Sequence, residues 1–222
     1  PAELLLSQGG VAPDPAAVAE LRGQLGLDRP ILEQYVVKMG QLLRGNFGRS
    51  MIDGFPVGDE IARRLPRTLE LIVAAALIAV LVGLPAGTAA AIRRGGLFDR
   101  IASGLAALGL AVPVFVVGTL MVLVFAQQLR WVPAGGFTAF GQNPGQHLLL
   151  LLMPAVTIAV GLAPIMFRIT RTSVLEVMGS EFVRTARAKG VSQPRILVHH
   201  VVRNALLPVV TVLALNLGGL LG

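Results

Sequence analysis

The last two thirds of the chain consist mainly of long runs of residues without a charged side chain. An α-helix needs about 20 apolar residues, at about 1.5 Å of rise each, to cross a hydrocarbon core of about 30 Å. A charged side chain near the centre of such a helix costs about 3 kcal/mol. The uncharged runs therefore predict four membrane-spanning helices, at about residues 68–92, 101–129, 147–168 and 202–222.

The composition agrees with a membrane protein. Hydrophobic residues make up 54% of the chain and charged residues 14%, whereas a soluble domain carries roughly 25% charged residues. The apolar content excludes a disordered chain, and the absence of cysteine excludes a disulfide-stapled module and a cysteine-ligated metal centre. A very apolar soluble bundle is the alternative, and four consecutive uncharged runs of this length disfavour it.

The distribution of charge predicts the orientation of the helices. The net charge of +7 does not point to nucleic acid, because the cations lie between the apolar runs, mainly in residues 93–100 and 168–203. Cytoplasmic loops carry the excess of Lys and Arg, so we place these two stretches inside the cell. Residues 130–147, which begin with the single cation Arg130 and the interfacial anchor Trp131, and residues 1–66 are then outside.

The outer segment, residues 1–66, reads as short helices before the transmembrane domain of residues 67–222. Asp14 and Pro15 are a helix cap and a first helical residue for a helix over 16–25, and a second helix covers 31–43. A third covers 56–64, and Pro66 separates it from the first span. Residues 1–66 contain no apolar segment that could carry them across the membrane, and residue 222 lies inside an apolar run, so we expect a further span upstream and more chain after residue 222.

Prolines lie inside or beside the predicted spans and are expected to kink them: Pro85, Pro113, Pro154, Pro164 and Pro208. Such kinks occur in ordinary helix packing and also in helices that line a transport pathway. The uncharged runs inside the predicted spans, residues 71–92, 101–129, 148–167 and 204–222, contain no acidic residue or histidine, which argues against a proton- or ion-coupled relay. Energy for transport would have to come from another subunit.

The cytoplasmic stretch 169–201 has the pattern of a helix, a turn and a second helix. A helix over 173–188 would carry an apolar stripe and end at Lys189 and Gly190, with a second helix beginning near Pro194. The stripe comprises Val174, Leu175, Val177, Met178 and Phe182. The bend between the two helices, at Lys189 and Gly190, is either a solvated basic loop or a docking surface for a cytoplasmic protein.

The sequence resembles the permease subunits of dipeptide, oligopeptide and nickel-type ABC importers. The resemblance rests on four motifs in the order of that family, and it covers essentially the whole chain. They are Leu25-Gly26-Leu27-Asp28-Arg29-Pro30, the stretch 43–50 (LRGNFGRS), the stretch 64–71 (RLPRTLEL), and Glu181 to Gly190 (EFVRTARAKG) continuing to residues 203–211 (RNALLPVVT).

The resemblance implies an all-α, polytopic bundle of the type I importer (MetI-like) architecture, in a bacterial inner membrane. The bend would be the family's EAA motif, whose coupling helix docks on an ATP-binding subunit. Gly190 and Ala186 match that motif, whereas Arg184 and Thr185 replace its glutamate and first alanine. The docking residues would be Glu181, Arg184, Thr185, Ala186, Arg187, Ala188, Lys189, Gly190, Val191 and Gln193.

The resemblance also implies partners. These are a second homologous permease subunit, two ATP-binding subunits that hold ATP and magnesium, an extracytoplasmic solute-binding protein, and membrane lipid, with no nucleic acid. The chain itself would bind no cofactor and hydrolyse nothing, and it has no Gly-x-x-x-x-Gly-Lys-Ser/Thr loop. The family normally has six spans, so this chain would lack the first and the last.

The expected function is a translocation pathway for a small solute, foremost di- and oligopeptides, driven by ATP hydrolysis in the partner subunits. The alternative is an ATP-independent secondary transporter or channel, although the spans offer few polar groups: Thr119, Thr157, Thr211 and Asn216. A membrane enzyme is disfavoured, because His147 lies outside while His199 and His200 lie inside and cannot converge. We expect all three histidines to be interfacial polar residues, not metal ligands.

Overall fold

A computed structural model of the chain describes residues 15–24 and 26–221. Within these ranges the protein is helical, and β-structure is limited to one isolated bridge between Arg49 and Pro56. The chain forms two compact units, Pro1–Arg67 and Thr68–Gly222, which we describe separately. The all-helical prediction is confirmed.

The first unit contains α2 (Pro15–Gln24), α3 (Ile31–Leu43) and the first turns of α4 (Val57–Ile92). The predicted cap Asp14 and the end of the predicted helix at Leu25 lie outside the described residues, whereas α3 has its predicted bounds. None of the described residues of this unit is buried. The described residues of this unit therefore form no apolar core of their own.

Helix α4 does not break at Pro66 as the sequence suggested. The expected short helix over 56–64 and the first span are one helix of 36 residues. Proline removes one backbone donor and frees the carbonyl four residues earlier, here that of Ala62. Residues 61–66 are all exposed, so solvent or headgroups can satisfy that carbonyl, and the helix continues.

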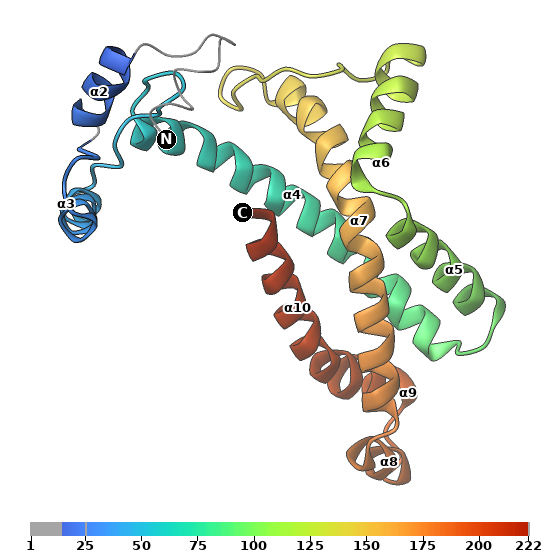
Figure 1. Ribbon diagram of the computed structural model, residues 1–222. Coiled ribbons are helices and arrows are strands. Elements are labelled where there is room, and N and C mark those ends of the chain that lie inside the picture. The colour runs from blue at the N-terminus through green and yellow to red at the C-terminus, as the bar shows by residue number, and fades with distance from the viewer. Residues whose placement is uncertain (1–14, 25, 222) are drawn as a thin grey trace. The chain divides into compact units, whose positions relative to one another are not determined.

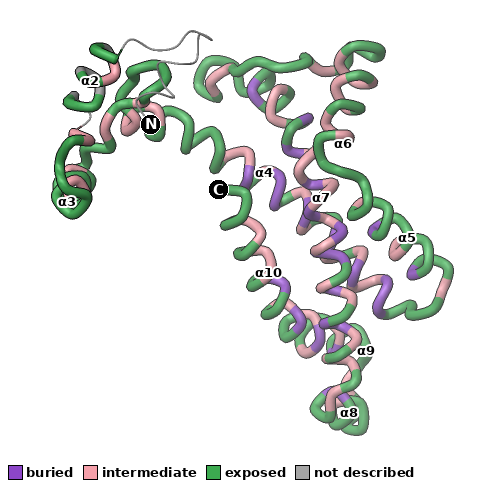
Figure 2. The backbone as a smooth tube through the Cα atoms, in the orientation of Figure 1, coloured by how far each residue is buried: buried purple, intermediate pink, exposed green. Residues whose placement is uncertain are grey.

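The second unit is organised around α7 (Pro144–Met178), which contacts every other long helix (Figure 1). Figure 2 shows the buried residues gathered along α7 and the facing parts of its neighbours. One core cluster joins α4, α7 and α10 (Arg203–Leu221) and consists of Ala76, Ala79, Ala159, Leu162, Met166 and Val209. Membrane helices pack closely through small residues, here the three alanines of the cluster.

Helices α4 and α7 touch through two glycines spaced four residues apart. A Cβ at Gly83 would lie 2.7 Å from Met166 Cβ, and a Cβ at Gly87 would lie 2.6 Å from the Phe167 carbonyl oxygen. Both distances are too short for a side chain, so the backbones approach as closely as a Gly-x-x-x-Gly pair permits. The two glycines therefore form the closest part of the contact between α4 and α7 described here.

The expected span over 101–129 is two helices in the structure. Helices α5 (Leu97–Ala111) and α6 (Val114–Met121), the latter continued by the π-helix η2 (Val122–Gln128), meet at 95°. Pro113 lacks the donor that would continue α5 and pushes Val112 into an extended conformation, with ψ at 123°. Each half has about 15 residues, or about 22 Å, so only the two together could cross a membrane.

The other predicted proline kinks stay predictions. Pro85 lies within α4, Pro154 and Pro164 lie within α7, and Pro208 lies within α10. Helix α7 begins at Pro144, where the Asn143 side chain accepts a hydrogen bond from the backbone N–H of Gln146 at 3.1 Å.

The chain ends in α8 (Glu181–Ala188), α9 (Gln193–Arg195), the π-helix η3 (Ile196–Val202) and α10. Among the described residues, three helices are long and apolar enough to cross a membrane, and a fourth span results if α5 and α6 count as one. The protein is therefore a multi-pass membrane protein, as predicted.

Candidate functional site

Helix α8 forms a separate element at the C-terminal end of α7. The predicted continuous helix over 173–188 is wrong, because α7 ends at Met178 and α8 starts at Glu181. Ser180 has extended backbone, with ψ at 153°, and its hydroxyl donates to the Val177 carbonyl at 2.6 Å. This local hydrogen bond competes with the helical pattern and ends α7 at Met178.

Helix α8 is anchored to the membrane bundle through Val183, with the half-buried Ala186 packed against the same cluster. Val183 is fully buried, and it joins a cluster with Ala91 of α4, Val174 of α7, Ala205 of α10 and Ile196 of η3. Phe182, which belonged to the predicted stripe, is 47% exposed instead. The break at residues 179–180 changes the rotation of α8 relative to α7, so Val183 points inward in place of Phe182.

The other predicted docking residues lie on the surface of α8 and of the turn that follows it. Glu181 and Arg184 form an exposed ion pair of 2.7 Å, measured from Oε1 to Nη1. The turn and the free face of α8 thus share one exposed surface, made of Glu181, Arg184, Thr185, Arg187, Ala188, Lys189, Gly190 and Gln193, with Ala186 and Val191 half-buried.

Gly190 makes the sharp turn after α8. Its φ is +78°, its N–H donates to the Arg187 carbonyl at 2.9 Å, and the Val191 N–H donates to the Ala186 carbonyl at 3.2 Å. This is the hydrogen-bond pattern of the Schellman motif, in which a right-handed helix is closed by one residue with positive φ. Glycine is favoured at that residue. Among the described residues, Arg187 and Lys189 have no ion-pair partner, so the turn presents two unneutralised cations.

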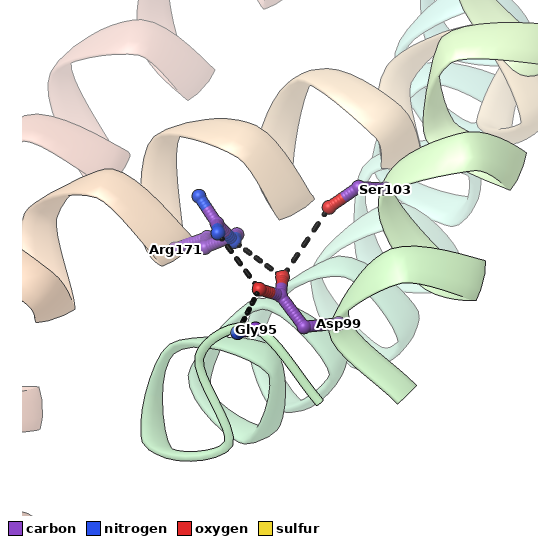
Figure 3. A network of polar contacts seen from close by, with 4 residues as sticks. All are labelled: Gly95, Asp99, Ser103 and Arg171. Carbon is purple, nitrogen blue, oxygen red and sulfur yellow. Dashed lines mark hydrogen bonds and ion pairs between the residues drawn. The ribbon is translucent and has the colours of Figure 1, made fainter. Parts of the chain in front are cut away.

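A buried ion pair joins α5 to the same end of α7 (Figure 3). Arg171 donates from Nε to Asp99 Oδ1 at 2.6 Å and from Nη2 to Asp99 Oδ2 at 2.9 Å. The carboxylate also accepts from the Gly95 N–H at 2.9 Å and the Ser103 hydroxyl at 3.4 Å. Asp99 is 4% exposed, so the buried charge is compensated by four hydrogen bonds.

Sequence reasoning treated Asp99 and Arg171 only as loop charges. A usable signal was present, because Asp99 is one of three acidic residues after residue 70 and a lone acid in a basic stretch invites a partner. The partner itself lies 72 residues away in the sequence, which no local pattern reveals.

The N-terminal end of α7 carries a different polar contact. His147 is 5% exposed, with Nδ1 2.7 Å from the Thr138 carbonyl and Nε2 2.5 Å from Glu70 Oε1 of α4. Phe137 and Phe140 contact its ring edge-on. His147 is therefore buried under the loop before α7, and its expected position at the membrane interface stays a prediction.

The four polar side chains that the sequence placed in the spans are satisfied within their own helix. Each hydroxyl or amide donates to the carbonyl four residues earlier, at 2.8 to 3.1 Å: Thr119, Thr157, Thr211 and Asn216. None of these groups is thereby aimed at a neighbouring helix as part of a polar relay. The described residues contain no group of three or more His, Asp or Glu side chains that could hold a metal ion.

A cavity of about 560 Å³ opens between α6, α7 and α10, and a second of about 410 Å³ opens between α6, α7 and residues 133–136. The first is walled by apolar side chains such as Val114, Ile158 and Leu215, with Asn216 as its polar side chain. These walls can surround a solute without binding specific groups on it.

Comparison with known proteins gives the following relatives. The family model described as "Binding-protein-dependent transport system inner membrane component" matches residues 83–222. The chain is 40% identical over 205 residues to the "Probable peptide ABC transporter permease protein y4tP" of Sinorhizobium fredii (strain NBRC 101917 / NGR234), covering 92% of this chain and 66% of that protein.

The chain is also 39% identical over all 222 residues to the "Glutathione transport system permease protein GsiC" of Salmonella choleraesuis (strain SC-B67). It is 38% identical to the protein of the same name in Escherichia coli (strain K12). In both cases the match covers 69% of the relative. The chain thus spans about two thirds of the length of these curated relatives.

Proposed function

Because the chain belongs to the family of inner membrane components of binding-protein-dependent transport systems, we propose that it forms part of the pathway of an importer for di- and oligopeptides. The relatives named above are described as peptide and glutathione permeases, and glutathione is itself a tripeptide. The apolar cavity walls suit a pathway of this kind, in which a separate solute-binding protein selects the cargo.

ATP hydrolysis in this proposal takes place in two partner subunits and not in this chain. Helix α8 is the surface on which one of them docks. The observation that carries this assignment is the packing of Val183, because a helix exposed to the solvent on one face is fixed by the other face to the ends of α4, α7, η3 and α10. A push on α8 therefore reaches these helices together.

The Asp99–Arg171 pair extends the same movement to α5. A bidentate pair resists both sliding and rotation of the two helices that it joins, so α5 follows the C-terminal end of α7. Closure of the ATP-binding subunits would then rock the helices around the cavity between α6, α7 and α10 and change its access, as in other alternating-access transporters.

The positive-inside rule places α8 in the cytoplasm and the first unit on the other side of the membrane. The solute-binding protein would dock there, against residues 1–66 and 130–147, and a second homologous permease subunit would complete the pathway. These placements follow from charge and from the family and are part of the proposal.

The docking proposal is tested by charge reversal of Arg187→Glu together with Lys189→Glu. We expect about tenfold or greater loss of co-purified ATP-binding subunits. The reason is that two cations at the interface are replaced by two anions, which a surface complementary to the cations would repel. Uptake of a peptide should fall with it, while membrane insertion stays normal. Gly190→Asp should act in the same direction, since it adds an acid at a turn that needs positive φ.

The matched control is Arg93→Glu together with Arg94→Glu, which changes the charge equally at exposed cations of the turn between α4 and α5. It should leave the ATP-binding subunits attached. Equal loss in both double variants would reject α8 as the docking surface. Peptide uptake that persists in the absence of any ATP-binding subunit would favour the alternative of a channel or secondary transporter.

A further inference from the structure

Helix α3 is amphipathic around a broad apolar arc. At about 100° per residue, seven of its side chains fall within an arc of about 140°. These are Ile31, Leu32, Tyr35, Val36, Met39, Leu42 and Leu43. The opposite side carries Glu33, Gln34, Gly40 and Gln41, together with a single valine, Val37.

The apolar arc is not used for packing within its own unit. No residue of α3 is buried, and Ile31, Leu32 and Leu43 are 85%, 76% and 89% exposed. An isolated 13-residue helix is marginal in water, and an exposed aliphatic surface of this size on a protein generally marks a partner or a membrane. The arc therefore requires a partner that the described unit does not supply.

The start of α4 holds α3 close to a membrane-entering helix. The Val57 N–H donates to the Gly48 carbonyl at 3.0 Å, and the Ser50 N–H donates to the Phe55 carbonyl at 2.9 Å. These bonds close the connecting loop, so only residues 44–47 separate α3 from the clamped segment.

The first turns of α4 also expose apolar side chains. Ile61 and Leu65 lie one helical turn apart and are each 43% exposed, between exposed charged residues. With 36 residues, α4 is about 54 Å long, which exceeds the hydrocarbon core of about 30 Å. Part of α4 therefore lies outside the hydrocarbon core, in the zone where amphipathic helices bind.

We propose that α3 lies in the surface of the lipid bilayer, with its apolar arc among the acyl chains. The shape of the arc fits a flat apolar medium, and Lys38 borders it, where its ammonium can reach the headgroups. Residues 29–49 carry four cations and one acid, which suits anionic lipid. This inference requires only that the protein is embedded in a membrane and does not depend on the transported solute or on ATP.

The absence of cysteine in the chain makes the test direct. Single cysteines are introduced by Leu32→Cys and Val36→Cys on the arc, and by Gly40→Cys and Gln41→Cys on the opposite side. Each variant of the full chain carries an NBD fluorophore and is reconstituted alone into vesicles of phosphatidylethanolamine and phosphatidylglycerol. Quenching is measured with doxyl-labelled lipid and with aqueous iodide.

We expect doxyl lipid to quench positions 32 and 36 at least several-fold more than positions 40 and 41, and iodide to show the reverse order. Equal quenching by iodide at all four positions would show that the arc faces water and would overturn the proposal. Protection of positions 32 and 36 from both quenchers would show contact with protein, including a second copy of the chain, and would also overturn it. Because no partner or nucleotide is present, the result is independent of the docking test on α8.

Discussion

The two ends of α7 are each fastened to another helix by a polar contact, and the two contacts differ in kind. At the C-terminal end, Arg171 and Asp99 form a bidentate pair with both charges largely shielded from solvent. At the N-terminal end, one nitrogen of His147 contacts Glu70, whose side chain is 40% exposed. The end that carries α8 is thus held by more hydrogen bonds and by less hydrated charges.

Because of this asymmetry, motion can be transmitted at one end of α7 and absorbed at the other. Two parallel hydrogen bonds fix both the distance and the rotation between α5 and α7, whereas a single bond fixes little more than a distance. A displacement that enters through α8 is passed on rigidly at the C-terminal end of α7. The N-terminal end, held by one bond and by the loop over His147, is the end that can yield.

The largest expected effect is at the C-terminal end. Arg171→Ala leaves Asp99 buried without its partner, and breaking a buried pair in this way costs about 3 kcal/mol of unfolding free energy. Arg171→Lys keeps the charge but not the fork, so its loss should be smaller. Thermal unfolding in detergent, followed by circular dichroism, measures both.

Arg168→Ala is the matched control for this change, since Arg168 is an exposed cation on the same helix. It should have almost no effect. Equal destabilisation by the two alanine variants would contradict the role that we give to the ion pair.

The close contact of α4 with α7 at Gly83 and Gly87 is expected to be the next most sensitive to mutation. Gly87→Ala places a methyl group 2.6 Å from the Phe167 carbonyl oxygen, and the resulting displacement of α4 from α7 should cost about 2 kcal/mol. The comparison is with Gly104→Ala in α5, where no atom lies within 4 Å. That change should be neutral or slightly stabilising, because alanine is the better helix former; a loss of stability there as large as in α4 would refute the close-contact explanation.

The smallest effect is expected at the N-terminal end. Glu70→Ala removes one hydrogen bond to His147 and should cost about 1 kcal/mol, since the glutamate side chain is partly hydrated. Glu70→Gln preserves a polar partner and should cost less. If Glu70→Ala proved as damaging as Arg171→Ala in the same unfolding experiment, the proposed asymmetry between the ends of α7 would be wrong.

Much of the architecture was predictable because it follows from local composition. The uncharged runs located the helices that can cross a membrane, and the Gly190 turn was expected from a glycine after a cationic helix end. The break at Pro113 was anticipated as a kink but not as a bend of 95°, because the angle depends on how α5 and α6 each pack on α7. Likewise, the inward side of α8 could not be assigned before the end of α7 at Met178 was known.

Local patterns were enough to identify the chain as a helical membrane protein of its family, since hydrophobic length and motif order are properties of neighbouring residues. Tertiary structure alone decided that Asp99 meets Arg171, that Glu70 meets His147, and that Gly83 and Gly87 face α7. These contacts join residues about 70 to 80 positions apart, and no periodicity of the chain encodes which helices become neighbours. Their selection depends on the combined packing of all the helices, in which each buried charge must find a partner and each close approach must find a glycine.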